Sequence, residues 1–296
     1  MVVHHGRFVW YELLTTDIAA AKAFYGEVVG WGARDASTPD LAYTLFSAGE
    51  APVSGLMDLP EEARKMGATP RWVGYVAVDD VDETVDRIRR LGGAVYVPPT
   101  DTNVGRISVV ADPQTANLAL INGLKLRPSQ PAEFDRPGRV GWHELAAADW
   151  KKAFAFYSEL FGWQQTDAET PRLDSYRLFS ADGQTIGGMS TKHPKVPVPF
   201  WLYYFNVDDI DMTAEHVRSG GGLIFQGPTE IPGGYWIARC VDPQGAMFGL
   251  QGPRSQANIG RIPAAEVPAS ELGWSAEWDG ISSKGRLVVP KPGPKR

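Results

Sequence analysis

Hydrophobic and polar positions follow the same order twice along this chain. The first copy, residues 10–31, reads WYELLTTDIAAAKAFYGEVVGW, and the second copy, residues 142–163, reads WHELAAADWKKAFAFYSELFGW. A constant offset of 132 residues relates the two copies, and aromatic, acidic and glycine positions recur together. A period of this length, kept through more than one predicted element, indicates a duplicated unit.

Each copy predicts a strand followed by a helix. The opening WxEL run is short and apolar, which is typical of a strand. Asp17 and Asp149 stand where an N-cap accepts the first N–H groups of a helix, and Gly30 and Gly162 suit a left-handed C-cap. Apolar residues lie between them at helical spacing, namely Ile18, Ala21, Tyr25 and Val28, then Trp150, Ala153, Phe154, Tyr157 and Phe161.

The repeat continues downstream with short strands, a second helix and a hairpin. Runs at 43–47 and 53–57 match runs at 176–180 and 186–189, and all of them predict strands. Two further strands lead into VDD motifs, where Asp80 and Asp209 are expected to cap helices that end at glycines. A DPQ turn then divides a hairpin in each half. Each half therefore contains two units of strand, helix and three strands.

Breaks in the pattern predict the domain boundaries. Residues 1–123 and 140–252 form the two expected domains, and the proline-rich, charged residues 124–139 form a linker. A chain of 296 residues is long enough for two domains, each with its own core. Residues 253–296 have no counterpart in the first half, and we expect a partly disordered C-terminal extension.

Composition excludes several classes of protein. Net charge is −6 and the basic residues form no block before the C-terminus, which argues against binding to nucleic acid. No run approaches about 18 apolar residues, so we expect no membrane span and see no cleaved signal. The single cysteine, Cys240, excludes an internal disulfide, and we expect a cytoplasmic protein.

The order of these motifs resembles the vicinal oxygen chelate superfamily. The resemblance rests on the capping Asp, the aromatic pair, the Gly-Trp that follows, and then VDD, a glycine pair and the DPQ turn, all found twice over residues 8–122 and 140–252. This superfamily includes glyoxalase I, the bleomycin-resistance proteins and the extradiol dioxygenases. The resemblance implies an α+β fold of two tandem glyoxalase-like domains. Each would contain two paired βαβββ modules that form a curved mixed sheet around a cup.

The resemblance also implies positions for metal ligands, but the residue types do not suit a metal. Metal-binding members carry His, Gln or Glu on the first and last strands of each module, pointing into the cup. Indole and aliphatic side chains cannot supply the oxygen or imidazole donors that divalent metals need. We therefore expect neither a metal at the inherited site nor another cofactor. The corresponding residues here are Trp10, Val73 and Ala119 in the first domain and Trp142, Leu202 and Gly249 in the second.

Strand alternation places one carboxylate beside the first tryptophan in each cup. Trp10 and Glu12 share a strand face, as do Trp142 and Glu144. A carboxylate there must be hydrogen-bonded, paired or able to take a proton, and structural and catalytic roles both remain open. The candidate catalytic residues are Glu12 and Glu144, with Glu144 preferred because Tyr235 and Trp236 could cover its cup. The candidate substrate-binding residues are Trp10, Tyr75, Trp142, Tyr204, Tyr235 and Trp236.

Two functions compete at this stage. The first is a metal-independent protein that binds a small aromatic or hydrophobic molecule, as the bleomycin-resistance branch does. The second is a lyase, isomerase or dioxygenase acting on a small oxygenated substrate, with Glu12 or Glu144 as general base. An interaction scaffold is a weaker third hypothesis. The expected partner is a small-molecule ligand, and a homodimer is left open.

Overall fold

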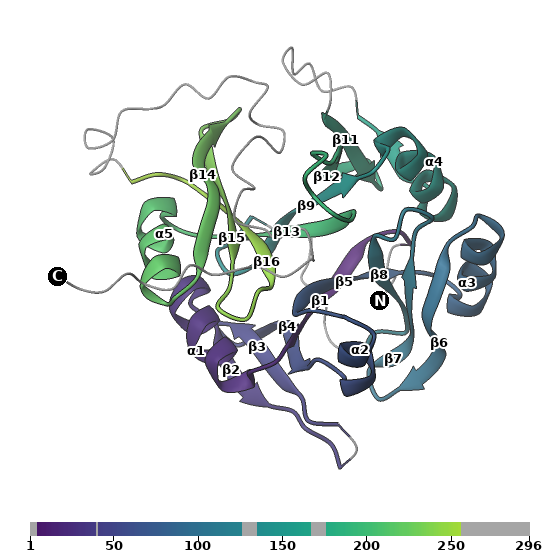
Figure 1. Ribbon diagram of the computed structural model, residues 1–296, viewed down its shortest axis with the longest axis horizontal. Helices are drawn as coiled ribbons and strands as arrows, with labels where there is room; N and C mark the ends of the chain where they lie inside the picture. Colours follow the sequence, from purple (N-terminus) through teal and green to yellow (C-terminus); the bar gives the residue numbers. More distant parts are fainter. Residues whose placement is uncertain (1–4, 40, 126–134, 167–175, 256–296) are drawn as a thin grey trace.

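The computed structural model describes residues 5–39, 41–125, 135–166 and 176–255, which form two similar domains (Figure 1). The expected extension beyond residue 255 and most of the expected linker lie outside the described residues. The elements of the first domain are β1 (Phe8–Thr15), α1 (Ile18–Val29), β2 (Gly32–Asp35), β3 (Thr44–Ala48), β4 (Ala51–Asp58), α2 (Glu61–Lys65), β5 (Arg71–Ala77), α3 (Val81–Arg90), β6 (Ala94–Thr102), β7 (Gly105–Ala111) and β8 (Asn117–Asn122). Those of the second are β9 (Val140–Ala147), α4 (Trp150–Phe161), β10 (Gln164–Gln165), β11 (Tyr176–Ala181), β12 (Gln184–Thr191), β13 (Phe200–Asn206), α5 (Ile210–Ser219), β14 (Leu223–Ile231), β15 (Tyr235–Val241) and β16 (Met247–Gly252).

Each domain is built on one mixed sheet of eight strands. The strand order is β2-β3-β4-β1-β5-β8-β7-β6 in the first domain and β10-β11-β12-β9-β13-β16-β15-β14 in the second. The first strands of the two modules, β1 and β5, lie antiparallel at the centre, and each pairs in parallel with the last strand of its own module. The second domain repeats these pairings. The predicted α+β fold of paired βαβββ modules is confirmed.

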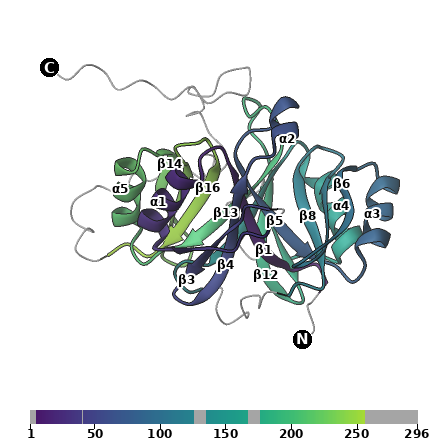
Figure 2. The same ribbon diagram turned by 90° about the horizontal axis from the view of Figure 1, so that it is seen from below.

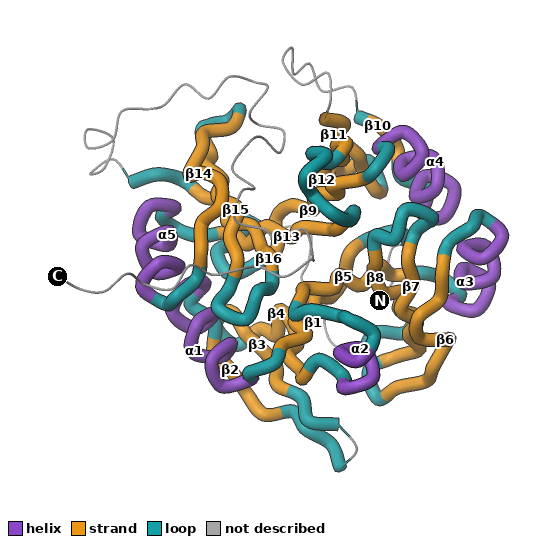
Figure 3. Tube along the Cα trace, in the orientation of Figure 1, coloured by secondary structure: helices purple, strands orange, loops and turns teal. Residues whose placement is uncertain are grey.

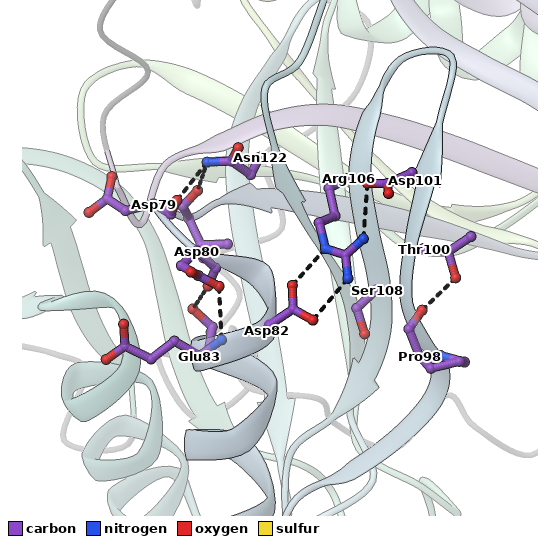
Figure 4. Close-up of polar contacts among 12 residues, drawn as sticks. Asp79, Asp80, Asp82, Glu83, Pro98, Thr100, Asp101, Arg106, Ser108 and Asn122 are labelled. Carbon is purple, nitrogen blue, oxygen red and sulfur yellow. Dashed lines mark hydrogen bonds and ion pairs between the residues drawn. The ribbon is translucent and has the colours of Figure 1, made fainter.

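The helix boundaries follow the predicted caps. The carboxylate of Asp17 accepts the N–H of Ala20, and Asp80 accepts the N–H of Glu83 in the same way (Figure 4). Gly30 ends α1 with a φ of 75°, a left-handed conformation that glycine adopts without a steric penalty. The short helix α2, which falls in a polar stretch of the sequence, was not predicted and buries no side chain.

Surface ion pairs tie α3 to the outer strands of the first sheet. Arg106 on β7 donates to Asp82 at the start of α3 and also contacts Asp101 on β6 (Figure 4). All three side chains are partly or largely exposed, so solvent screens these pairs and they contribute little to stability. These ion pairs therefore connect α3, β6 and β7 at the surface of the first domain, and their charged groups stay exposed to solvent.

The helices pack across the domain boundary. Helix α1 of the first domain lies beside α5 of the second, and α4 of the second domain lies beside α3 of the first (Figures 1 and 2). The strands lie between these two helix pairs, so the helices occupy opposite flanks of the molecule (Figure 3). The aromatic ring of Phe24 on α1 meets Phe248 on β16 edge-on, with 5.9 Å between ring centroids.

This arrangement gives the two domains a common core, contrary to the expectation of one separate core each. The largest buried cluster contains residues of both halves, including Tyr25 and Trp72 from the first domain and Tyr157 and Trp201 from the second. Each sheet buries one face in this shared cluster, because β5 and β8 of the first sheet lie against β13 and β16 of the second. The sequence repeat could not distinguish this packing from two independent cores.

The repeated motifs meet one another at the domain boundary. The indole N–H of Trp31 donates to the carbonyl of Gly138, and that of Trp163 donates to the carbonyl of Gly6. The aspartate of each DPQ turn accepts backbone N–H groups within its turn and a tyrosine hydroxyl from the other domain. The motifs that identify the repeat therefore also join its two copies.

Within the part of the chain that the structure describes, each helix is too short or too polar to cross a lipid bilayer.

Candidate functional site

Each sheet has a second face, turned away from the shared core, and on it lies a smaller cluster of buried residues. We call these faces the first cup and the second cup. The first cup is formed by Trp10, Leu45, Val73, Tyr75, Ala119 and Ile121, with Tyr43, Ile107 and Val109 packed against them. The second cup is formed by Ala146, Val196, Leu202 and Tyr204, with Trp142, Phe200, Phe225, Ile237 and Met247 packed against them.

Glu12 lies in the first cup between two tyrosines. Alternation along β1 points Tyr11 and Leu13 into the shared core and Trp10 and Glu12 into the cup. The hydroxyl of Tyr43 donates to Oε1 of Glu12 over 2.7 Å, and the hydroxyl of Tyr75 donates to Oε2 over 2.6 Å. The structure therefore brings three of the predicted site residues together, with Tyr43 as an addition.

Two further details hold Tyr43 in this place. The indole Nε1 of Trp10 donates to the Tyr43 hydroxyl over 3.2 Å, so a chain of hydrogen bonds runs from Trp10 through Tyr43 to Glu12. Gly55 on β4 pairs with Glu12 on β1, and a Cβ atom at position 55 would overlap the Tyr43 hydroxyl. A glycine is needed there because the tyrosine occupies the space of a side chain.

The environment of Glu12 favours its protonated form. Burial raises the pKa of the Glu12 carboxyl above its usual value, although the hydrogen bonds from Tyr75 and Tyr43 act in the opposite direction. Burial and the neighbouring Glu12 carboxylate also raise the pKa of the Tyr43 and Tyr75 hydroxyls, so both tyrosines remain neutral donors. Among the described residues, none forms an ion pair with Glu12.

Glu144 lies in the corresponding place in the second cup, but it has a cationic partner. Nη2 of Arg239 lies 2.8 Å from Oε1 and 3.0 Å from Oε2 of Glu144, and both side chains are at most 4% exposed. The Tyr204 hydroxyl donates to Glu144 over 2.9 Å and accepts Nε of Arg239 over 2.7 Å. Arg239 also donates to Gln226. Burial is the largest single influence on Arg239 and lowers its pKa, but Glu144 and Tyr204 together outweigh burial and raise the pKa of Arg239.

The two carboxylates therefore differ in what is left for a ligand. The charge of Glu144 is matched within the protein, and its exposed fraction is 2%, whereas Glu12 is 9% exposed and hydrogen-bonded only to neutral groups. The sequence favoured Glu144 over Glu12 because a lid was expected above it. The ion pair with Arg239 reverses that preference in favour of Glu12. A general base, or a group that binds a charged ligand, needs a carboxylate lone pair that is not already engaged by a cation of the protein.

The expected lid over the second cup is only half present. Along β15, Ile237 and Arg239 point to the second cup, while Trp236 points to the other face and packs against the shared core. The guanidinium of Arg254 lies 3.5 Å from the centre of the Trp236 ring. Tyr235, at the start of the strand, is 44% exposed. The structure therefore does not bring Trp236 to Glu144.

The inherited metal positions do converge, but they carry no ligands. Trp10, Val73 and Ala119 meet in the first cup, as the family pattern implies, and none of them can coordinate a divalent ion. Trp142 and Leu202 meet in the second cup. Across residues 5–39, 41–125, 135–166 and 176–255, no group of three or more His, Cys, Asp and Glu residues is arranged to hold a metal. The residues at this site do not fit the metal of the family.

His143, next to Glu144 in the sequence, lies outside both cups. Its Nδ1 donates to the carbonyl of Ile186 over 2.6 Å, and its Nε2 accepts the hydroxyl of Tyr11 over 2.6 Å. Burial lowers the pKa of His143 to about 4. The neutral imidazole therefore links the two domains through its hydrogen bond with Tyr11. Tyr11 and His143 occupy equivalent positions of the repeat, 132 residues apart.

Sequence reasoning missed three residues of the cups, although signals for them existed. Tyr43 and Tyr176 open the repeated YxLFS motif, and each accepts the indole N–H of the tryptophan in its cup. Arg239 stands between apolar residues in a predicted strand, at the alternation that faces the cup. A buried arginine requires a carboxylate or several acceptors, and Glu144 on the same face was the available partner.

Comparison with known families agrees with this architecture. The family model of the Glyoxalase/Bleomycin resistance protein/Dioxygenase superfamily matches residues 7–119 and again residues 139–250. The two matches cover the two domains and more than half of the chain. The protein belongs to this superfamily.

Two relatives indicate the range of proteins that resemble the chain. CFP32 of Mycobacterium bovis, named as a candidate glyoxylase, is 34% identical over 251 residues, which cover 83% of this chain and 95% of CFP32. The anthracycline biosynthesis protein DnrV of Streptomyces peucetius is 27% identical over 154 residues, which cover 47% of this chain and 54% of DnrV.

Solved structures share the fold at low sequence identity. The Mn(II)-bound glyoxalase from Novosphingobium aromaticivorans superposes with a TM-score of 0.58 at 18% identity, covering 86% of this chain and 83% of that one. A variant of homoprotocatechuate 2,3-dioxygenase from B. fuscum superposes with a TM-score of 0.59 at 14% identity, covering 85% and 72%. At these identities the likeness concerns the fold and not the chemistry.

Proposed function

We propose that this protein binds a small molecule with an aromatic or hydrophobic body in its first cup. The observation that carries the proposal is the arrangement of the Trp10, Tyr43 and Tyr75 rings around the Glu12 carboxylate. Aromatic rings supply a large contact area for a flat ligand, and the carboxylate supplies a polar contact that orients it. The remaining wall of the cup is aliphatic, with Val73, Ala119 and Ile121.

The second cup has a structural role under this proposal. Arg239, Tyr204, Gln226 and Glu144 hydrogen-bond to one another and fill the face that a ligand would use. A buried network of this kind holds its members in fixed positions when each is satisfied. One ligand per chain is therefore expected.

The relatives support a small-molecule ligand of this class. DnrV is named as an anthracycline biosynthesis protein, and so is DauV of Streptomyces sp. (strain C5), a protein that is 32% identical to this chain over 154 residues. This chain lacks ligand side chains at the inherited metal positions, so recognition by shape and aromatic contact accounts for binding better than metal coordination.

A ligand titration followed by NMR tests the proposal. Small anthraquinone and naphthalene compounds are added to ¹⁵N-labelled protein, and we expect shifts of the Trp10 indole resonance and of β1, β5 and β8. Trp10→Ala should weaken binding by at least about tenfold, because a fully buried aromatic contact is lost. Trp142→Ala, the equivalent change in the second cup, is the matched control and should leave affinity unchanged. Shifts centred on the second domain would contradict the proposal.

An enzymatic function is the second candidate, and the raised pKa of Glu12 favours it. A carboxyl whose pKa lies nearer neutrality is a better general base than an ordinary glutamate. Such a base would remove a proton from a substrate carbon held against Trp10. Exchange of that hydrogen with deuterium from solvent, present in the natural protein and lost in Glu12→Gln, would distinguish catalysis from binding alone.

A further inference from the structure

The two cups contain the same carboxylate arrangement with one difference. In both, a glutamate on the first central strand accepts a tyrosine hydroxyl from the second central strand, Tyr75 in one domain and Tyr204 in the other. In the second domain Arg239 pairs across the hairpin with Gly249, and in the first domain Val109 pairs with Ala119. Val109 therefore stands where Arg239 would be.

The second cup shows what this arrangement binds. The Arg239 guanidinium lies within hydrogen-bonding distance of both carboxylate oxygens and of the tyrosine hydroxyl. A buried carboxylate in apolar surroundings needs such a cation or a proton, since solvent no longer stabilises its charge. The first cup has the carboxylate and the tyrosine, and an aliphatic side chain at the position of the cation.

The surroundings of Glu12 favour an organic cation over a hydrated inorganic one. Glu12 meets the hydroxyls of Tyr43 and Tyr75, and Trp10 with the aliphatic residues of the cup completes a largely apolar site. An organic ammonium group brings its own apolar body into such a site, whereas an inorganic cation would have to give up its hydration shell. Each carboxylate oxygen accepts one hydroxyl and keeps further acceptor capacity for an N–H donor. The described titratable groups that contact Glu12 are the two tyrosines. Arg71 lies further along the same face of β5, and its Nε donates to the carbonyl of Thr69.

We propose that the first cup binds an organic amine, protonated at neutral pH, whose ammonium group takes the place beside Glu12 that the Arg239 guanidinium takes beside Glu144. This inference rests on the proposed function and names the chemical class of its ligand. An aromatic or aliphatic body attached to the amine would lie against Trp10 and the aliphatic wall of the cup.

Calorimetric titration with three matched probes tests the charge preference. Benzylamine carries the cation, benzyl alcohol is its neutral isostere, and benzoate carries the opposite charge. We expect benzylamine to bind at least about tenfold more tightly than the other two. The benzylamine affinity should rise as the pH is raised through the titration of Glu12, because a protonated Glu12 must release its proton to accept the cation.

Two substitutions locate the effect at Glu12. Glu12→Gln should remove the preference for benzylamine over benzyl alcohol. Glu83→Gln, which removes an exposed carboxylate on α3, is the matched control for net charge and should preserve the preference. Val109→Arg should build the internal ion pair of the second cup into the first and abolish benzylamine binding. Because Val109→Arg adds a partner to Glu12, retained thermal stability of that variant would show that the fold is intact.

The outcomes separate the two proposals. Equal binding of benzylamine and benzyl alcohol in the first cup would leave the aromatic-binding function standing and overturn the amine. A preference for benzylamine that persists in Glu12→Gln would also overturn it. Failure of all three probes and of the anthraquinone and naphthalene compounds to shift first-cup resonances would overturn both proposals.

Discussion

The hydroxyl of Tyr25, on the first helix of the first domain, donates to Oδ2 of Asp242 in the second domain over a distance of 3.0 Å. The same hydroxyl accepts the indole N–H of Trp72 over 2.9 Å. The repeat supplies a second copy of this contact, in which Tyr157 donates to Asp112 over 3.1 Å. Two equivalent buried contacts therefore close the boundary between the domains.

Removing either hydroxyl should destabilise the whole protein. Tyr25→Phe leaves the Trp72 N–H without its acceptor and Oδ2 of Asp242 without its donor, at a cost of about 1–3 kcal/mol for each buried group left unpaired. Tyr157→Phe should cost a similar amount. Urea unfolding of both variants measures the loss. Tyr96→Phe, at a position that is 56% exposed, is the control and should change stability by less than about 0.5 kcal/mol.

Asp242 should make stability depend on pH in a defined window. Burial raises the pKa of Asp242 to about 6 from its usual 3.8. The folded state then holds this proton more tightly than the unfolded state, so the contribution of this group to stability falls as the pH rises from about 4 to 6.

The variant Asp242→Asn isolates that contribution. His143, whose pKa burial lowers to about 4, acts with the opposite sign in the same window, so the total slope is a poor measure. The difference in unfolding free energy between the natural protein and Asp242→Asn should fall as the pH rises from about 4 to 6 and stay level above that. A difference that rises with pH would contradict the assigned direction.

The two cups should respond unequally to loss of charge. Arg239→Met leaves Glu144 buried without its cation, and we expect a loss of about 3–5 kcal/mol. Glu12→Gln leaves no cation unpaired, but its single amide oxygen can accept only one of the two tyrosine hydroxyls, so its cost should stay below that of Arg239→Met, at about 1–2 kcal/mol. Chemical denaturation of the two variants at neutral pH makes the comparison. Equal losses of unfolding free energy in the two variants would mean that Glu12 stabilises the fold as much as Glu144 does.

The purified protein should contain far less than one divalent metal ion per chain. This stays a prediction, and it rests on Trp10, Val73 and Ala119 at the inherited ligand positions. Elemental analysis, together with thermal unfolding in the presence and absence of a chelator, checks it. A stoichiometric metal whose removal lowers the melting temperature would show that ligands other than these hold an ion.

Neither domain should fold on its own. A fragment of residues 1–123 would expose the faces of Tyr25 and Trp72 that are buried in the shared cluster. We expect such a fragment to lack cooperative unfolding by circular dichroism. Adding a fragment of residues 138–255 should restore it, because the second fragment supplies the missing half of each interface. Cooperative unfolding of the isolated fragment would mean that the shared core is dispensable.

The sequence by itself determined the elements and their order. Asp17 and Gly30 delimit a helix through local hydrogen bonds and backbone geometry, and both signals recur 132 residues later. Alternation along β1 put Trp10 and Glu12 on one face. These features depend on neighbours in the chain, so they can be predicted from it. Local sequence motifs also identified the family. They predict residues that cannot coordinate a metal at the positions where the family carries its metal ligands.

Only the tertiary structure decided which carboxylate is left for a ligand. Glu12 and Glu144 are equivalent in the repeat, and they differ because Arg239 reaches Glu144 from a strand 95 residues away while Val109 stands at the matching place. The sequence predicts Trp236 on a loop beside the second cup, but β15 already begins at Tyr235, and alternation along the strand turns Trp236 to the face of the shared core. The pairing and register of strands that are distant in the sequence set these relationships. The local pattern of hydrophobic and polar residues does not encode them.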